Sequence, residues 1–208
     1  MFWYQWMTLA ALAICIGSLL FHLIRLIRLG NPQDFSKQHG NISKAVQYSF
    51  TKAMSPAKKE SAYLHLPTYT AGIIYHLGTF LSIFLFFAFL LKIEFNQLTN
   101  YILIGFLIIS GISGLGILIK RMMKSELLSL SNPDDFISNL LVTLFQLATA
   151  LVLFMSNSIV LYYTLVTALL LYLPMGKLKH TIYFFAARYH LGFFYGWRGV
   201  WPIMNHKN

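Results

Sequence analysis

The sequence predicts an all-α membrane protein that crosses the bilayer five times, and two observations carry this fold class. The 208 residues are 57% hydrophobic and only 11% charged, which is far more apolar than a soluble domain. The apolar residues are gathered into five runs, each long enough at about 1.5 Å per residue to cross a hydrocarbon layer of about 30 Å. These runs lie near residues 5–28, 68–91, 101–120, 135–155 and 159–181.

The first apolar run is expected to remain as a helix rather than to be removed as a signal peptide. It lacks a basic leader, and no small-residue cleavage site precedes Arg25 and Arg28. Trp3, Tyr4 and Trp6 are aromatic residues of the kind that anchor a helix at the membrane interface.

The basic residues predict the orientation of the chain. Of its 16 Lys and Arg residues, all but Lys92 fall in the first connection, the third connection or the tail, or at their edges. The positive-inside rule therefore places the N-terminus outside and the C-terminus in the cytoplasm. We expect one multi-pass domain, residues 1–208, in the cytoplasmic (inner) membrane of the cell, with a cytoplasmic connection over 30–67 and a cytoplasmic or interfacial tail over 182–208. Because the charges sit in short loops, they fit membrane topology rather than nucleic-acid binding.

Cysteine content excludes several kinds of site. Cys15 is the only cysteine and lies in an apolar run, so this chain alone cannot form a disulfide, a thiolate zinc site or an iron-sulfur cluster. No glycine-rich nucleotide-binding loop is present either. Any metal that carries electrons must have other ligands.

Two short stretches predict local structure. In SNPDDF, Asn132 and Pro133 are expected to cap and begin a helix, while Asp134 and Asp135 favour the positive end of its dipole. Proton uptake by the two carboxylates is the alternative. In GISGLG, the glycines at 111, 114 and 116 are expected to permit close helix packing.

Two further features leave a structural and a functional interpretation open. Asn139 and Gln146 lie seven residues apart on one helix face, where they could hydrogen-bond across helices or contribute to a quinone pocket. The tail stretch FFAARYHLGFFYGWRGVWP mixes aromatic and basic residues, which fits either an interfacial helix or a docking surface for a cytoplasmic subunit.

His76 and His180 are the histidines best placed for chemistry. His76 lies inside the second apolar run, and His180 is expected at the cytoplasmic end of the fifth. Each has a glycine four residues earlier, Gly72 and Gly176, which would clear space for a flat group against the helix. A hydrogen bond from His76 to Thr79 or Ser113 on a helix is the alternative.

The flat group that two such imidazoles suit is a haem. Two neutral histidines can fill both axial positions of the iron, which favours electron transfer over oxygen chemistry. Arg121, Lys177 and Lys179 could neutralise its propionates. Because the chain has no CxxCH motif, the haem would be non-covalent and of b type.

Three stretches make the chain resemble the gamma subunit of respiratory nitrate reductase and related membrane cytochrome b subunits, including those of heterodisulfide-reductase-like complexes. They are YHLGTF (75–80), IKRMMKSELLSLSNPDDFISNLLVTLFQLA (119–148) and LPMGKLKH (173–180). The resemblance implies two b haems between the second and fifth helices, with His76 and His180 holding the one nearer the cytoplasm. The positions of the other ligand pair here hold Phe86 and Tyr162, which predicts a single haem b.

These observations predict an electron-transfer subunit rather than a stand-alone enzyme. It would pass electrons between membrane quinone and a cytoplasmic iron-sulfur or oxidoreductase partner. A haem-free membrane anchor or assembly subunit of a similar complex is the alternative. A small transporter ranks last, because no charged residue lies at mid-membrane and no pair of broken helices is evident.

Overall fold

A computed structural model describes residues 1–29, 35–55 and 65–202, and these residues form helices and turns without any strand. The chain divides into two compact units, and the single domain over residues 1–208 stays a prediction. Unit 1 comprises Met1–Ile16 and His65–Leu178, and unit 2 comprises Gly17–Leu64 and Lys179–Asn208. The helix α1 therefore contributes its first half to unit 1 and its second half to unit 2.

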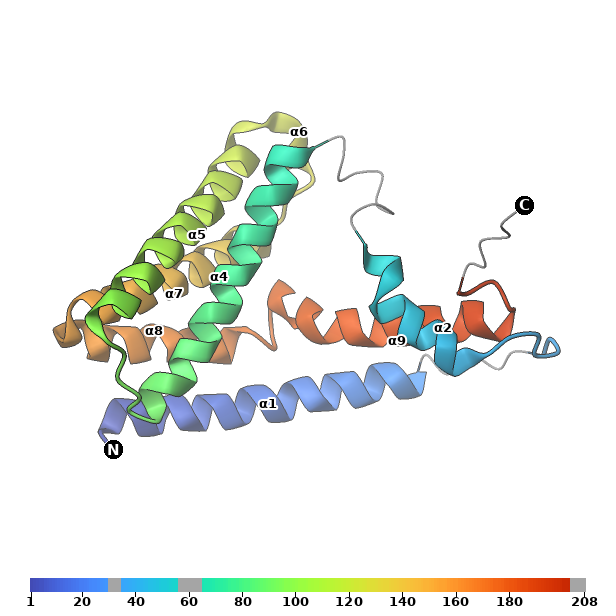
Figure 1. Cartoon of the computed structure of the whole chain (residues 1–208), viewed down its shortest axis with the longest axis horizontal. Coiled ribbons are helices and arrows are strands. Elements are labelled where there is room, and N and C mark those ends of the chain that lie inside the picture. The colour runs from blue at the N-terminus through green and yellow to red at the C-terminus, as the bar shows by residue number, and fades with distance from the viewer. Residues whose placement is uncertain (30–34, 56–64, 203–208) are drawn as a thin grey trace. The chain divides into compact units, whose positions relative to one another are not determined.

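Four helices are long and apolar enough to cross a membrane, which confirms the multi-pass all-α class. Their bounds agree with the predicted runs to within four residues (Figure 1). They are α1 (Trp3–Leu29), α4 (Leu66–Leu90), α5 (Gln97–Met123) and α7 (Pro133–Phe154). Which end of the chain faces the cytoplasm stays a prediction.

The fifth predicted span is broken. We expected one helix over 159–181, but α8 (Ile159–Tyr172) stops at Tyr172. Pro174 explains the break, because proline lacks the backbone N–H that would continue the helix. Leu173 still has helical dihedral angles, and its amide donates to the Leu169 carbonyl. The amides of Met175 and Gly176 both donate to the Tyr172 carbonyl, which closes the turn. A fifth span exists only if Ser156–Tyr172 and Lys177–Trp197 are counted together.

The remaining described elements are short, apart from α9. They are α2 (Ile42–Phe50), the 3₁₀ turn η1 (Lys52–Met54), α6 (Ser125–Ser129), the 3₁₀ turns η3 (Ser156–Ser158) and η4 (Lys177–Lys179), and α9 (His180–Trp197). The start of α7 confirms the SNPDDF prediction. The Asn132 side chain accepts from the Asp135 amide, the Asp135 carboxylate accepts from the Asn132 amide, and Pro133 opens the helix.

The long helices of unit 1 alternate in direction along the sequence, so helices that pack together can be antiparallel or parallel. The Ser110 hydroxyl of α5 donates to the Ile74 carbonyl of α4 at 3.0 Å, and α5 runs antiparallel to α4 (Figure 1). Along α1 and α8, the Tyr4 and Tyr163 ring centroids lie 5.4 Å apart and Thr8 bonds to Thr167 at 2.8 Å, so these two helices run parallel. Parallel and antiparallel pairs of this kind arise when successive helices cross a layer alternately.

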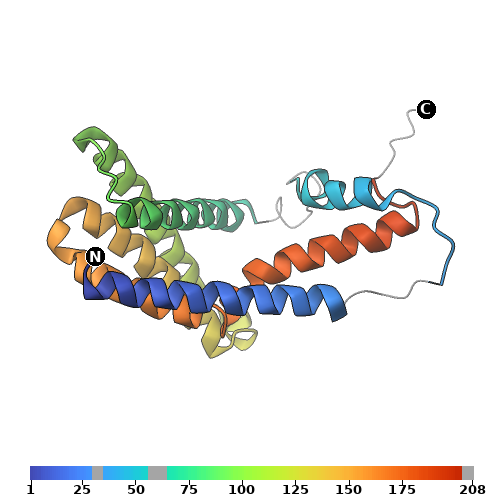
Figure 2. The same cartoon turned by 90° about the horizontal axis from the view of Figure 1, so that it is seen from below.

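Unit 2 brings together the first connection and the tail, which lie far apart in the sequence. Figure 2 shows α2 alongside α9, and glycines of α9 make the close approach possible. A Cβ atom at Gly192 would lie 2.5 Å from Val46 Cα, and one at Gly196 would lie 2.6 Å from Ala45 Cβ. The Ser49 hydroxyl also donates to the Arg188 carbonyl at 2.8 Å. The connection and the tail therefore fold together.

The glycines of GISGLG differ in their surroundings. A Cβ atom at Gly114 would collide with the Tyr75 ring and lie 2.6 Å from the Thr143 hydroxyl oxygen. At Gly111 it would lie 2.6 Å from a Leu147 methyl group, whereas at Gly116 it would meet nothing within 4 Å. The close-packing prediction is confirmed for Gly111 and Gly114 and is wrong for Gly116.

Gly114→Ala is expected to destabilise the protein, and Gly116→Ala is its matched control. Both changes raise helix propensity on α5 by about 1 kcal/mol. Only the alanine at 114 overpacks the contact with α4 and α7, at a cost of about 1–3 kcal/mol. The midpoint of thermal unfolding in detergent should be lower for Gly114→Ala than for Gly116→Ala by about 2–12 °C. Equal midpoints for the two variants would contradict this packing assignment.

Candidate functional site

His76 lies on α4, within a candidate membrane span, and its side chain is exposed at the protein surface. Its Nδ1 is 2.7 Å from the carbonyl oxygen of Gly72. A carbonyl can only accept, so Nδ1 carries the proton in this contact. In the neutral imidazole the other nitrogen, Nε2, is then an unprotonated base. This is the tautomer in which a histidine binds a metal through Nε2 while a backbone carbonyl orients the ring.

The surroundings of His76 leave space on this side of α4. A Cβ atom at Gly72 would meet no atom within 4 Å. The two hydroxyl groups expected as alternative partners bind elsewhere: Thr79 donates to the Tyr75 carbonyl, and Ser113 donates to the Ile109 carbonyl. Neither hydroxyl group therefore donates a hydrogen bond to His76, as the structural alternative would have it.

His180 and Gly176 stand in other settings than the sequence predicted. His180 is the exposed first residue of α9 in unit 2, not the last turn of the fifth span. Gly176 lies in the turn after α8 in unit 1, where its Cβ position is 2.6 Å from the Tyr172 ring and 2.7 Å from Asp134 Oδ1. Gly176 therefore makes room for Tyr172 and Asp134 and does not open space on a helix face.

Lys177 and Arg121, the predicted propionate partners, both lie against Asp135. Lys177 Nζ donates to Asp135 Oδ1, and Arg121 NH1 lies 3.5 Å from the same oxygen. The Asp135 side chain is only 5% exposed, whereas those of Arg121 and Lys177 are 34% and 51% exposed. Arg121 also donates to the Ser131 hydroxyl at 3.1 Å. The two cations thus neutralise a buried carboxylate, and both side chains remain partly exposed.

Asp134 is held by a different set of groups. Its Oδ1 accepts from the Tyr172 hydroxyl and, at 3.1 Å, from the Ser138 hydroxyl. Asp134 therefore connects the start of α7 to the end of α8, and Asp135 connects it to the turn that follows. These contacts support the structural reading of SNPDDF.

Asn139 and Gln146 contribute to a buried polar network between α4 and α7. Gln146 is fully buried, and its Nε2 donates to the Thr79 hydroxyl at 2.8 Å and to the Tyr75 carbonyl at 3.0 Å. The Tyr75 hydroxyl in turn donates to the Asn139 carbonyl at 2.9 Å. Asn139 Oδ1 accepts from the Thr143 hydroxyl at 3.2 Å. The Gln146 amide thus serves the contact between helices, as the first of the two interpretations had it. Asn139 contacts α4 through its backbone carbonyl, and its side chain bonds within α7.

The other described histidines differ from His76 in their surroundings. His22 is partly buried on α1, His39 and His65 are exposed, and the His190 ring lies 3.3 Å from the Leu26 carbonyl oxygen. His206 lies outside the described residues. Within residues 1–29, 35–55 and 65–202, no three side chains of His, Cys, Asp or Glu gather as a metal site would need.

A cavity of about 460 Å³ in unit 1 was missed by sequence reasoning. It lies where α4, α5, α7 and α8 have their ends near the 91–96 and 155–158 turns. Its polar lining comes from Glu94, Asn100 and Ser156, and its apolar lining comes from Phe89, Ile93, Phe95, Val152, Leu153 and Ile159. Asn100 Oδ1 is buried and has no hydrogen-bond partner among the described residues. Sequence offered only one signal, an asparagine inside the first turn of an apolar helix.

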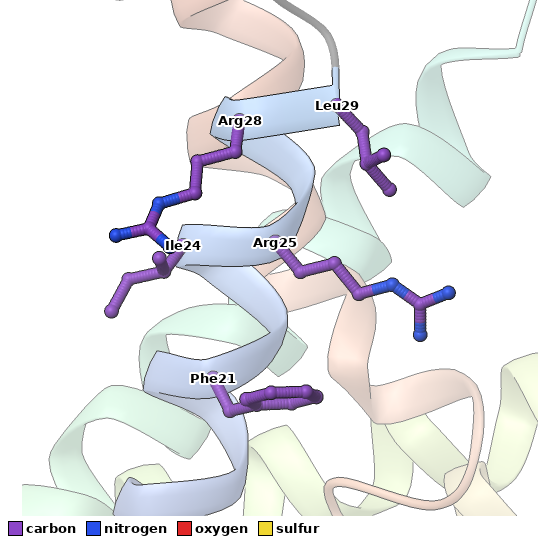
Figure 3. Close-up of a pocket in the computed structure, with 5 residues that line it drawn as sticks. All are labelled: Phe21, Ile24, Arg25, Arg28 and Leu29. Carbon is purple, nitrogen blue, oxygen red and sulfur yellow. The ribbon is translucent and has the colours of Figure 1, made fainter.

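A second hollow, of about 330 Å³, lies in unit 2 on the last turns of α1. It is lined by Phe21, Ile24, Arg25, Arg28 and Leu29. Figure 3 shows the guanidinium groups of Arg25 and Arg28 pointing to different sides of the helix. They do not converge on one bound group.

Asp135→Ala is expected to destabilise unit 1 and Glu126→Ala is not. The first change removes a helix cap and leaves Lys177 and Arg121 without their shared anion, at a cost of about 1–3 kcal/mol given their partial exposure. The second removes an exposed carboxylate from α6. Titration with SDS, followed by helical circular dichroism, measures the free energy of unfolding. The assignment fails if the two variants unfold alike.

Comparisons with known proteins add no relative. No family model matches the chain, and neither a curated protein nor a solved structure does. The likeness to the nitrate reductase gamma subunit therefore rests on the three stretches quoted from the sequence, and the cofactor and activity that it implies are a proposal.

Proposed function

We propose that this protein is a membrane cytochrome b subunit that carries electrons between quinone and a cytoplasmic iron-sulfur or oxidoreductase partner. The observation that carries the proposal is the His76 ring. Its Nδ1 is bound to the Gly72 carbonyl at 2.7 Å, its side chain is exposed within an apolar helix, and the position beside it at Gly72 is open. An intramembrane ionisable group with a free basic nitrogen is a functional group by default.

We propose one haem b as the cofactor, as the resemblance implies, and His76 and His180 are the residues that would hold its iron. The bound group would supply a one-electron carrier without an open coordination position. The backbone carbonyl of Gly72 orients the His76 ring and leaves Nε2 as the nitrogen that would bind the metal. Lys177 and Arg121 would give positive charge to the propionates, a charge that they already share with Asp135.

A single haem is proposed because the positions of a second ligand pair are filled with packed aromatic rings. Phe86 is buried and has its ring centroid 6.4 Å from that of Tyr163. Tyr162 is fully buried, 6.2 Å from the Phe145 ring and 5.6 Å from the Phe89 ring. Neither side chain is an imidazole, and the packing around both is that of a core.

The cavity lined by Asn100 is the place we propose for the quinone headgroup. Its polar groups include two acceptors, Asn100 Oδ1 and the Glu94 carboxylate, which match a ligand that donates hydrogen bonds. A quinol has two hydroxyl donors on an aromatic ring, and the apolar wall suits that ring. We propose that the protein lies in the inner membrane, with its N-terminus outside and its C-terminus in the cytoplasm. In this orientation the cavity lies toward the outer side of the membrane.

A haem-free membrane anchor or assembly subunit of a similar complex is the alternative function. It would keep the helices of unit 1 and the packing of α2 on α9. It offers no reason for an exposed histidine inside an apolar helix, which favours the electron-transfer function.

Purified protein is expected to contain one b-type haem per chain. A pyridine haemochrome assay and reduced-minus-oxidised spectra measure its content. His76→Ala and His180→Ala should each abolish the signal, whereas His39→Ala, which changes an exposed loop histidine, should keep it. A colourless, well-folded chain from haem-sufficient cells would reject the function, and two haems per chain would reject the ligand count.

Asn100→Leu is expected to weaken quinol binding. Loss of one hydrogen bond of about 1–1.5 kcal/mol corresponds to a rise of roughly fivefold to tenfold in the quinol concentration that half-saturates haem reduction. Stopped-flow absorbance with a soluble quinol measures this concentration. Gln97→Leu is the control, since it exchanges an exposed amide for leucine in the same turn of α5. Identical half-saturation in the two variants would place the quinol elsewhere.

A further inference from the structure

We propose that unit 2 is a binding surface for anionic phospholipid headgroups, formed by the last turns of α1 together with α2 and α9. This surface is separate from the electron-transfer function and does not depend on a haem. Its occupant follows from charge, from exposed aromatic side chains and from the place of α9 beside α1.

The charge of the chain is concentrated in unit 2. This unit contains 11 of the 16 Lys and Arg residues but only two of the six Asp and Glu residues, which gives it +9 of the net charge of +10. Its two acidic residues, Asp34 and Glu60, lie outside the described residues. Its described basic residues are Arg25, Arg28, Lys37, Lys44, Lys52, Lys179, Arg188 and Arg198. A surface of this charge attracts anions.

Along α9, basic groups lie over aromatic rings four residues away. Arg198 is 3.7 Å from the Phe194 ring centroid, and Arg188 is 5.6 Å from that of Phe184. Lys179 lies 6.0 Å from the Tyr183 ring. The negative face of a ring attracts a cation and helps to hold it in place. Phe185, Tyr189 and Phe194 are also exposed, which is the mixture of side chains found at membrane interfaces.

A contact within unit 2 places α9 at the end of a membrane span. The His190 ring lies 3.3 Å from the Leu26 carbonyl oxygen, near the last turn of α1. Arg25 and Arg28 on those turns point to different sides (Figure 3), so their charge serves several headgroups rather than one pocket. A phospholipid layer meets both needs of this surface, since it supplies phosphates for the cations and acyl chains for the exposed rings. An acidic protein would supply only the first.

Native mass spectrometry of the full chain in detergent tests the proposal. The chain is incubated with dioleoylphosphatidylglycerol or, at the same concentration, with dioleoylphosphatidylcholine, and the retained lipids are counted. We expect preferential retention of phosphatidylglycerol. Arg25→Gln with Arg188→Gln should lower its affinity by about fivefold or more, since each basic residue near the surface adds to the attraction. Lys92→Gln with Lys124→Gln removes two charges from unit 1 and should change little.

The outcomes separate the proposal from its competitors. Equal retention of the two lipids, or equal losses in the two double variants, would overturn it. Circular dichroism of both variants checks that their helices remain. A poly-glutamate peptide is added in a parallel sample, and displacement of phosphatidylglycerol by the peptide at matched charge would assign the surface to an acidic protein instead. Haem content is measured in the same samples, so failure of the electron-transfer function is scored separately.

Discussion

Hydrocarbon offers no hydrogen-bond partner, and the arrangement of unit 1 depends on this constraint. Gln146 is fully buried, and its Nε2 finds partners within the protein in the Thr79 hydroxyl and the Tyr75 carbonyl. Its Oε1 has no hydrogen-bond partner among the described residues. The Tyr75 hydroxyl then donates to the Asn139 carbonyl. Each contact joins α7 to α4 at a defined register. Gly114 lets the Tyr75 ring pass α5, so the glycine serves the polar network as well as the packing.

His76 meets the same constraint in another way. Its Nδ1 is satisfied by the carbonyl of Gly72 on its own helix, so it needs no neighbouring helix for that bond. The described residues provide no hydrogen bond for Nε2, and the ring is exposed. A residue kept only for packing would gain by being apolar here, because an imidazole facing lipid is costly. The proposed haem would give this Nε2 nitrogen a partner.

Local features were predictable from the sequence, and contacts between distant segments were not. Hydropathy located four spans because burial in lipid requires long apolar helices, and the cap at Asn132 follows from side-chain chemistry within four residues. The same apolar pattern continues across Pro174, so it hid the end of α8 at Tyr172. Which glycine faces a neighbouring helix depends on the rotation of α5 about its axis. The amino-acid sequence of GISGLG does not indicate this rotation. The pairing of α2 with α9 likewise joins segments more than 100 residues apart in the sequence, such as Val46 and Gly192.

The positive-inside rule counts basic residues of both units alike, but their contacts differ between the two units. In unit 1, Lys120 donates to the Thr68 hydroxyl and Lys177 to Asp135, so each cation joins two segments of the chain. In unit 2, Arg188 and Arg198 lie over aromatic rings of their own helix. The positive-inside rule counts charges and does not distinguish these cases. Removing a cation from the first group breaks a contact that holds helices together, whereas removing one from the second changes what the surface attracts.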